Sequence, residues 1–135
     1  MVHTIDIEEY VFDEVYKAIG SDLPAGCLVS EYVPVAEKLP LVSFVEIANL
    51  TYRSGQDNRL RENFALIAYD VNIYAPKKEQ CRAIAAKLDQ AMLNMQFDRS
   101  SPGLHFMVNL NDPAISRINI LYEAVTDGAR IFRQR

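Results

Sequence analysis

A strand pattern and a helix pattern follow each other directly in the stretch of residues 63–95, NFALIAYDVNIYAPKKEQCRAIAAKLDQAMLNM. Apolar residues alternate in its first part, which predicts a strand over Asn63–Ala75 with one face on a core. Pro76 follows and is well placed near the first turn of a helix. Beyond Pro76 the apolar residues recur at helical spacing, which predicts a helix over Lys77–Met95. The predicted buried face of that helix consists of Cys81, Ile84, Ala85, Leu88, Met92 and Met95.

Upstream of this stretch the sequence predicts a second strand and an N-terminal helix. Leu41–Leu50 is dense in Val, Phe and Ile, as in a mostly buried strand. A very polar segment, residues 53–62, joins the two strands and is far longer than a tight hairpin needs. Apolar residues at every fourth position predict a helix over Ile7–Ile19, with Asp6 as its N-cap and Gly20 as its C′ residue.

The remaining elements are shorter. We expect a strand over Cys27–Val33, a loop over Asp98–Pro102, and strands over Leu104–Leu110, Ile115–Thr126 and Ala129–Gln134, with a turn at Asp127–Gly128. The prediction is therefore one α+β domain over residues 1–135. It has an antiparallel or mixed sheet, on which the N-terminal helix and one long central helix pack. The order is α-β-β-β-α-β-β, with room for one further strand.

Composition narrows the function classes. A chain of 135 residues with a net charge of −4 is a poor candidate for a general nucleic-acid binder, which is usually basic. No stretch approaches the roughly 20 apolar residues of a membrane span. Residues 1–6 lack the features of a secretion signal, so we expect synthesis in the cytosol. Cys27 and Cys81 lie among apolar residues and are interpreted as buried reduced thiols, although a disulfide between them stays open.

The residue types that usually carry catalysis are scattered. His3 and His105 have no partners at metal-ligand spacing. The glycines form no phosphate-binding loop, and no serine has a nucleophile-elbow context. Glu46 and Glu123 are interpreted as paired or half-exposed strand carboxylates. The acidic residues of the first helix are interpreted as a solvated face. We therefore predict no enzyme activity, no cofactor and no metal site, and a small metal-dependent hydrolase or nuclease has the least support.

Two charged segments are candidate contact sites. The polar loop carries Arg53, Asp57, Arg59, Arg61 and Glu62, and we expect it to contact a protein partner. The alternative is a nucleic-acid-associated accessory protein that uses the Arg53–Arg61 loop, although no aromatic residues are interleaved there for base stacking. Arg130 and Arg133 lie in a small basic C-terminus. They are candidates for a subunit contact, with the acidic first helix of an adjacent copy as the counterpart.

The order of these elements resembles a known family. The residues that carry the resemblance are Leu39–Ile47 (LPLVSFVEI), Tyr69–Tyr74 (YDVNIY), Lys77–Ile84 (KKEQCRAI) and the turn Asn109–Pro113 (NLNDP), which leads into Ser116–Ile118. Together they resemble the tail terminator, or tail completion, proteins of long-tailed bacteriophages and prophages. The resemblance covers roughly residues 5–133, and its motifs are structural rather than catalytic.

The resemblance implies a structural protein without enzyme activity or cofactor. Such proteins form a hexameric ring that caps the tail tube, and then offer a surface to the head completion or connector protein. The expected partners are other copies of the chain, the tail tube protein and the connector, with no membrane and no specific nucleic acid. The expected location is the virion tail, assembled in the cytoplasm of the host bacterium. Another head–tail joining protein would share much of this pattern.

Overall fold

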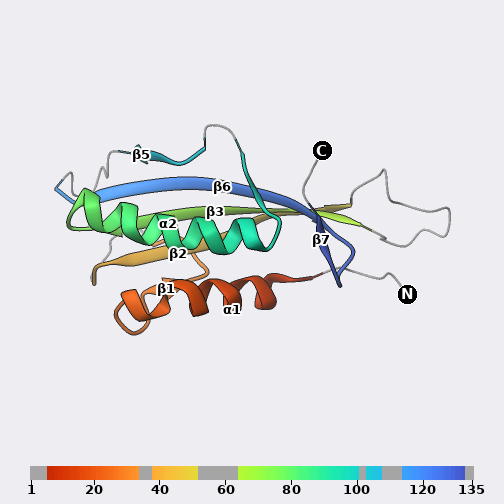
Figure 1. Cartoon of the computed structure of the whole chain (residues 1–135), viewed down its shortest axis with the longest axis horizontal. Coiled ribbons are helices and arrows are strands. Elements are labelled where there is room, and N and C mark those ends of the chain that lie inside the picture. The colour runs from red at the N-terminus through yellow and green to blue at the C-terminus, as the bar shows by residue number, and fades with distance from the viewer. Residues whose placement is uncertain (1–5, 34–37, 52–63, 101–102, 108–113, 133–135) are drawn as a thin grey trace.

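A computed structural model describes residues 6–33, 38–51, 64–100, 103–107 and 114–132 (Figure 1). Its elements confirm the predicted α+β class, with two helices packed on a mixed sheet. The helices are α1 (Glu8–Ile19) and α2 (Lys78–Asn94), and a 3₁₀ turn η1 (Gly20–Asp22) follows α1. The strands are β1 (Leu28–Val29), β2 (Leu41–Thr51), β3 (Ala65–Ala75), β4 (Asp98–Arg99), β5 (His105–Met107), β6 (Ser116–Thr126) and β7 (Ile131–Phe132).

Three long strands form the centre of the sheet. β2, β3 and β6 are eleven residues each and pair antiparallel in the order β2-β3-β6. Short strands complete both sides. β1 pairs parallel with the start of β2 and makes the sheet mixed. On the far side of β6, the strands β7, β4 and β5 pair with successive parts of its length.

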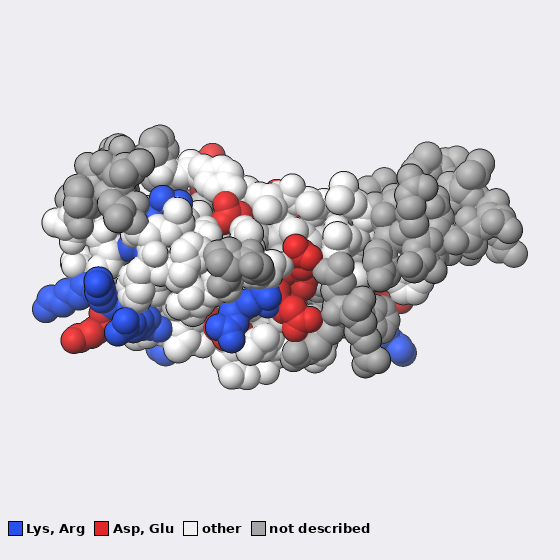
Figure 2. Space-filling model, turned by 90° about the horizontal axis from the view of Figure 1, so that it is seen from above, with Lys and Arg blue, Asp and Glu red and all other residues white. Residues whose placement is uncertain are grey.

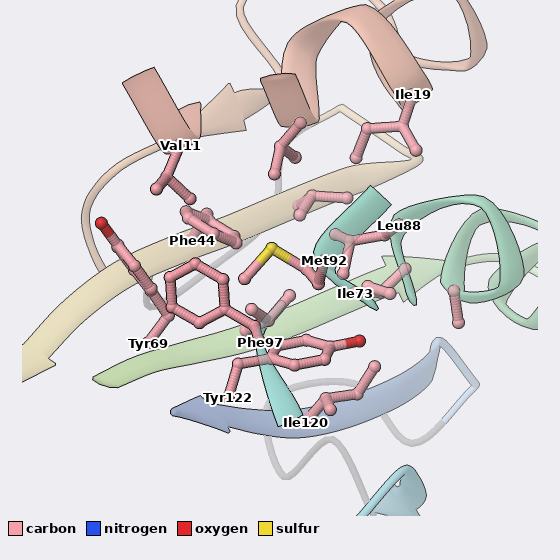
Figure 3. Packing of buried hydrophobic residues seen from close by; sticks show 14 of the residues in the cluster. Val11, Ile19, Phe44, Tyr69, Ile73, Leu88, Met92, Phe97, Ile120 and Tyr122 are labelled. Atoms are coloured by element: carbon pink, nitrogen blue, oxygen red, sulfur yellow. The ribbon is translucent and has the colours of Figure 1, made fainter. Parts of the chain in front are cut away.

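One face of this sheet and both helices share a single core. Alternate residues of β3 and β6 point into it, as expected for strands with one face on a helical layer. Figure 3 shows large side chains from both helices and all three long strands converging there. Phe44 stacks on Tyr69 with ring centroids 4.6 Å apart, and Tyr69 meets the edge of Phe97 at 5.6 Å. Phe97 is fully buried although it follows the end of α2.

The two helices begin and end for different local reasons. Asp6 lies one position before the N-cap of α1, yet its Oδ1 accepts a hydrogen bond from the Glu8 N–H at 3.0 Å. The prediction of Gly20 as the C′ residue is wrong, because Gly20 is the C-cap, with a right-handed φ of −57°, and leads directly into η1. At the end of α2 it is Gln96 that adopts the left-handed conformation, with φ of 73°. The N–H groups of Gln96 and Phe97 then donate to the carbonyls of Leu93 and Met92, which ends the helix as a Schellman motif.

Other differences concern the short strands. The strand predicted over Cys27–Val33 is only Leu28–Val29, and part of the predicted Asp98–Pro102 loop is β4. Met107 is the last described residue of the strand predicted over Leu104–Leu110. Cys27 and Cys81 are both buried and free, which confirms their interpretation as reduced thiols.

Candidate functional site

A groove of about 870 Å³ opens at one end of the helical layer. It lies between the start of α1, the end of α2 and the turn that joins β6 to β7. Ile7 and Met95 are almost fully buried and, with the partly buried Ile131, give it an apolar base. Polar residues of α1 border this base. We call the site the acidic groove and define it by Asp6, Ile7, Glu9, Tyr10, Asp13, Met95, Arg130 and Ile131.

The charge of the acidic groove comes mostly from α1. Asp6, Glu9 and Asp13 are all exposed, and they recur at three- and four-residue spacing along one side of the chain. Arg130 is the one cation among the described residues that line the groove. Within the described part of the chain, no ion pair joins Arg130 to these carboxylates. The described residues that line the groove therefore carry a net negative charge.

The β6–β7 turn that carries Arg130 is closely hydrogen-bonded. Asp127 Oδ1 accepts from the N–H groups of Ala129 and Arg130 at 2.9 and 2.7 Å. These bonds, the one from Arg130 first, lower the pKa of Asp127. Thr126 Oγ1 donates to the Arg130 carbonyl at 2.6 Å and accepts from the Gly128 N–H at 3.0 Å. Gly128 has φ of 94°, the left-handed region that favours glycine. The predicted turn is therefore present, and it fixes the backbone at Arg130.

Glu46 is a carboxylate with a raised pKa near this end of the sheet. It faces the helical layer on β2, and its Oε1 accepts a hydrogen bond of 3.3 Å from the Tyr69 hydroxyl. Burial raises the pKa of Glu46, and the negative charge of Glu8 raises it further. Burial and the adjacent Glu46 likewise raise the pKa of Tyr69. This geometry fits a paired strand carboxylate, as the sequence indicated.

The opposite face of the sheet carries a row of polar side chains that bond to one another. Asn72 Oδ1 accepts from Arg117 Nε and Nη2 at 3.0 and 2.8 Å, and from Asn119 Nδ2 at 3.1 Å. Asp70 accepts from Asn119 Nδ2 and from the Tyr32 hydroxyl, both at 2.7 Å. We call Tyr32, Asp70, Asn72, Arg117 and Asn119 the polar row. Because its members satisfy one another, the row serves the structure of the sheet.

A second charged surface lies where α2 begins. Lys77, Lys78 and Arg82 are exposed there, and we call these three residues the basic end. The Lys78 Nζ lies 5.5 Å and the Arg82 guanidinium carbon 5.0 Å from the centroid of the Phe106 ring on β5. Figure 2 shows basic side chains gathered at the left end of the molecule, where α2 begins in Figure 1. We did not predict this surface. Its signal was the Lys78–Arg82 spacing of four residues directly after Pro76.

The structure places only part of the predicted contact sites. Arg53, Asp57, Arg59, Arg61, Glu62 and Arg133 lie outside the described residues, so the contacts expected of them remain predictions. Arg130 is exposed in the acidic groove, together with acidic residues of the first helix of its own chain. The prediction paired it with the first helix of another copy, and that intermolecular contact remains a prediction.

Metal ligands do not gather in the described part of the chain. No group of three or more histidine, cysteine or acidic side chains is arranged there to hold an ion. His105 Nδ1 lies 3.0 Å from the Gly103 carbonyl, a local contact, and His3 is outside the described residues. Among the described residues, neither helix has the length and apolar character that crossing a membrane demands.

Comparison with protein-family models and with curated proteins finds no match to this chain.

Proposed function

We propose that this protein is a structural component of bacteriophage tail assembly, a tail terminator that forms a ring on the tail tube and joins it to the head connector. The observation that carries the proposal is the β2–β3 hairpin. Its two eleven-residue strands pair from Leu41 and Tyr74 to Thr51 and Ala65, with one register shift between Glu46 and Ala48, and they continue past the ends of both helices (Figure 1). The element order is also that of the family which the sequence resembles.

A terminator needs a rigid body and two unlike contact surfaces. One surface must bind the end of the tube, and the other must not allow further tube subunits to add. In this chain the shared core of α1, α2 and the long strands supplies the rigid body. The part of the hairpin that continues past the helices supplies an arm that differs from the helical layer in shape. A ring further requires a head-to-tail interface whose rotation closes. These features support the proposal without any catalytic group.

The direct test is capping of tail tubes. Purified protein is added to polymerising tubes of a long-tailed phage, and the tube ends are imaged by electron microscopy. We expect ring-shaped density at one end of each tube and a halt in growth there. A variant that lacks Ser54–Leu60 in the hairpin loop serves as the control. Tubes that keep growing at the normal rate, with bare ends, would contradict the proposal. Binding to the head connector without capping would indicate another head–tail joining protein.

DNA binding tests the alternative function. The chain has a net charge of −4, so we expect no salt-dependent binding to labelled DNA in fluorescence anisotropy, even at low salt. The paired variant Arg59→Ala plus Arg61→Ala shows whether any signal comes from the loop. Binding by the natural chain that the paired variant loses would favour the nucleic-acid-associated alternative.

A further inference from the structure

We infer that copies of this chain dock end to end, with the basic end of one copy seated in the acidic groove of the next. The inference rests on the self-assembly that the proposed function requires, and it names the two surfaces. Helix α2 separates the two surfaces, because it begins at the basic end and its last residue, Asn94, lines the acidic groove. Its 17 residues extend about 25 Å at 1.5 Å per residue. The two surfaces therefore lie too far apart to meet within one molecule.

The charges on α2 run against the preference of an isolated helix. Anions stabilise the positive N-terminal end of a helix and cations the negative C-terminal end. Lys77, Lys78 and Arg82 instead lie at the start of α2, with Glu79 as the acid of its first turn, and no basic residue lies in its last turn. Helix stability thus gives no reason for the three cations. The helix dipole adds to their positive potential at one end and to the negative potential of the groove at the other.

The basic end is held in place before any partner arrives. Lys78 and Arg82 both lie over the Phe106 ring, at 5.5 and 5.0 Å from its centroid, which restricts two otherwise mobile side chains. Ordering such side chains on binding carries an entropic cost. Contacts that already exist in the free molecule reduce this cost. An exposed pair of cations fixed on one aromatic ring is therefore suited to recognise a negative surface.

The acidic groove has the complementary features. Its three carboxylates, on Asp6, Glu9 and Asp13, face one cation, Arg130, so the entering lysines and arginine meet net negative charge. The side chain of Tyr10 is 52 % exposed beside them and presents a ring to a cation. The partly buried Ile131 gives apolar surface to the aliphatic stem of a lysine or arginine, above the almost fully buried Ile7 and Met95. The groove thus matches a basic end in charge and in the mixed character of its side chains.

Because one surface binds a different surface, the contact is heterologous. Such contacts build a closed ring when the rotation between neighbours closes, and an open chain when it does not. A ring is what a tube cap requires. Association driven by exposed charges also weakens with salt, since screening acts over about 10 Å at 0.1 M.

The test exchanges the charges of the two surfaces. One variant, Glu9→Lys with Asp13→Lys, makes the groove basic. The other, Lys78→Glu with Arg82→Glu, makes the basic end acidic. Native mass is measured for each by light scattering and native mass spectrometry over a concentration series at low salt. We expect the natural chain to associate and each variant alone to lose roughly tenfold or more in affinity, as exposed interface charges of like sign repel.

Mixing the two variants is the decisive step. In an equimolar mixture every groove has opposite charge to the basic end of the other variant, so association returns with strict alternation of the two chains. A single chain that carries all four substitutions also regains self-association. The control, Lys17→Glu with Lys87→Glu, lowers the net charge by the same amount as Lys78→Glu with Arg82→Glu does, at exposed positions outside both surfaces. We expect this control to associate normally.

Circular dichroism and urea unfolding confirm that each variant folds. Where the groove variant Glu9→Lys with Asp13→Lys does not fold, the neutral substitutions Glu9→Gln with Asp13→Asn replace it. Variants that associate as the natural chain does, or a mixture that stays monomeric, would overturn the inference, and so would a natural chain that is monomeric throughout. The proposed function is judged separately by tube capping. A monomeric chain that still caps tubes would refute only the docking, and a chain that associates as inferred without capping would refute only the function.

Discussion

Leu88 on α2 is fully buried between the helix and the sheet, at a position that helical spacing alone predicted. We expect Leu88→Ala to reduce the free energy of unfolding by about 2–5 kcal/mol, because the lost methyl groups leave a cavity in a close-packed core. Urea denaturation measures this change. Gln80→Ala, at an exposed position of the same helix, is the matched control and should stay within about 0.5 kcal/mol. A loss below that value for Leu88→Ala would contradict the assigned core face.

Glu46 predicts a pH dependence whose sign follows from its raised pKa. Burial first, and the charge of Glu8 next, raise this pKa in the folded state, so the unfolded chain releases the proton at lower pH. The stability from this group is complete below the ordinary glutamate pKa and is lost as pH rises through the raised value. We expect Glu46→Gln to have a higher urea midpoint than the natural chain at pH 7.

The advantage of Glu46→Gln should shrink as pH falls toward the ordinary glutamate pKa of about 4.3. The glutamine oxygen still accepts the hydrogen bond from Tyr69, so the comparison isolates the charge. Glu79→Gln removes one exposed carboxylate and controls for the change in net charge. An equal difference between the natural chain and Glu46→Gln at every pH would show that ionisation of Glu46 does not affect folding.

Single residues show where sequence reasoning succeeds and where it stops. Spacing identified the buried faces of both helices, because burial follows the helical period directly. The acidic groove was not predicted, since it joins the first helix, the end of the second and the last turn, which are distant in sequence. Gly20 was assigned the C′ position from its residue type, but it is the C-cap of α1 and the chain continues from it into η1.

The connection between β2 and β3 can be shortened to test what the hairpin contributes. Thirteen residues, Tyr52–Phe64, separate the last paired positions Thr51 and Ala65. Deleting Ser54–Leu60 leaves six, one more than the two to five residues common in hairpin loops, so the shortened connection can still join the two strands. We expect this variant to keep the circular dichroism spectrum and melting temperature of the natural chain, and to lose capping of tail tubes.

A variant of the same length, with residues 54–60 replaced by glycine and serine, separates loop length from loop chemistry. Capping by that variant would show that length alone matters. Unfolding of the deletion variant would instead show that the loop contributes to the core, contrary to the prediction.

The long strands were predicted with nearly correct ends, whereas the short strand β1 was predicted too long and β4 was not predicted. β2, β3 and β6 carry enough alternation to be recognised, and their predicted ends lie within two residues of those in the structure. β4 is two residues long, and it pairs through its backbone, which leaves no side-chain pattern to detect. The parallel pairing of β1 with β2 depends on the path of the chain after η1, and no local signal in the sequence specifies it.

The molecule as a whole should unfold in one step. A single cluster of buried side chains joins α1, α2 and the three long strands, so neither helix can leave without exposing the same core. We expect urea transitions followed by far-UV and near-UV circular dichroism to coincide. The near-UV signal reports on the fully buried Tyr69 and Tyr122. Transitions that separate at a concentration where the native mass is constant would indicate two independent units and contradict this prediction.

The polar row has a consequence for how the chain finds its fold. β3 and β6 alternate so regularly that sliding one past the other by two residues would keep every apolar side chain on the correct face. Asn72 and Asn119 stand directly opposite each other, and Asn72 is almost completely buried. A slip that placed Leu121 opposite Asn72 would separate Asn72 from both Asn119 and Arg117, and an unsatisfied buried amide costs about 1–3 kcal/mol. The polar row therefore favours the native register of β3 and β6 over this shifted register while the sheet forms.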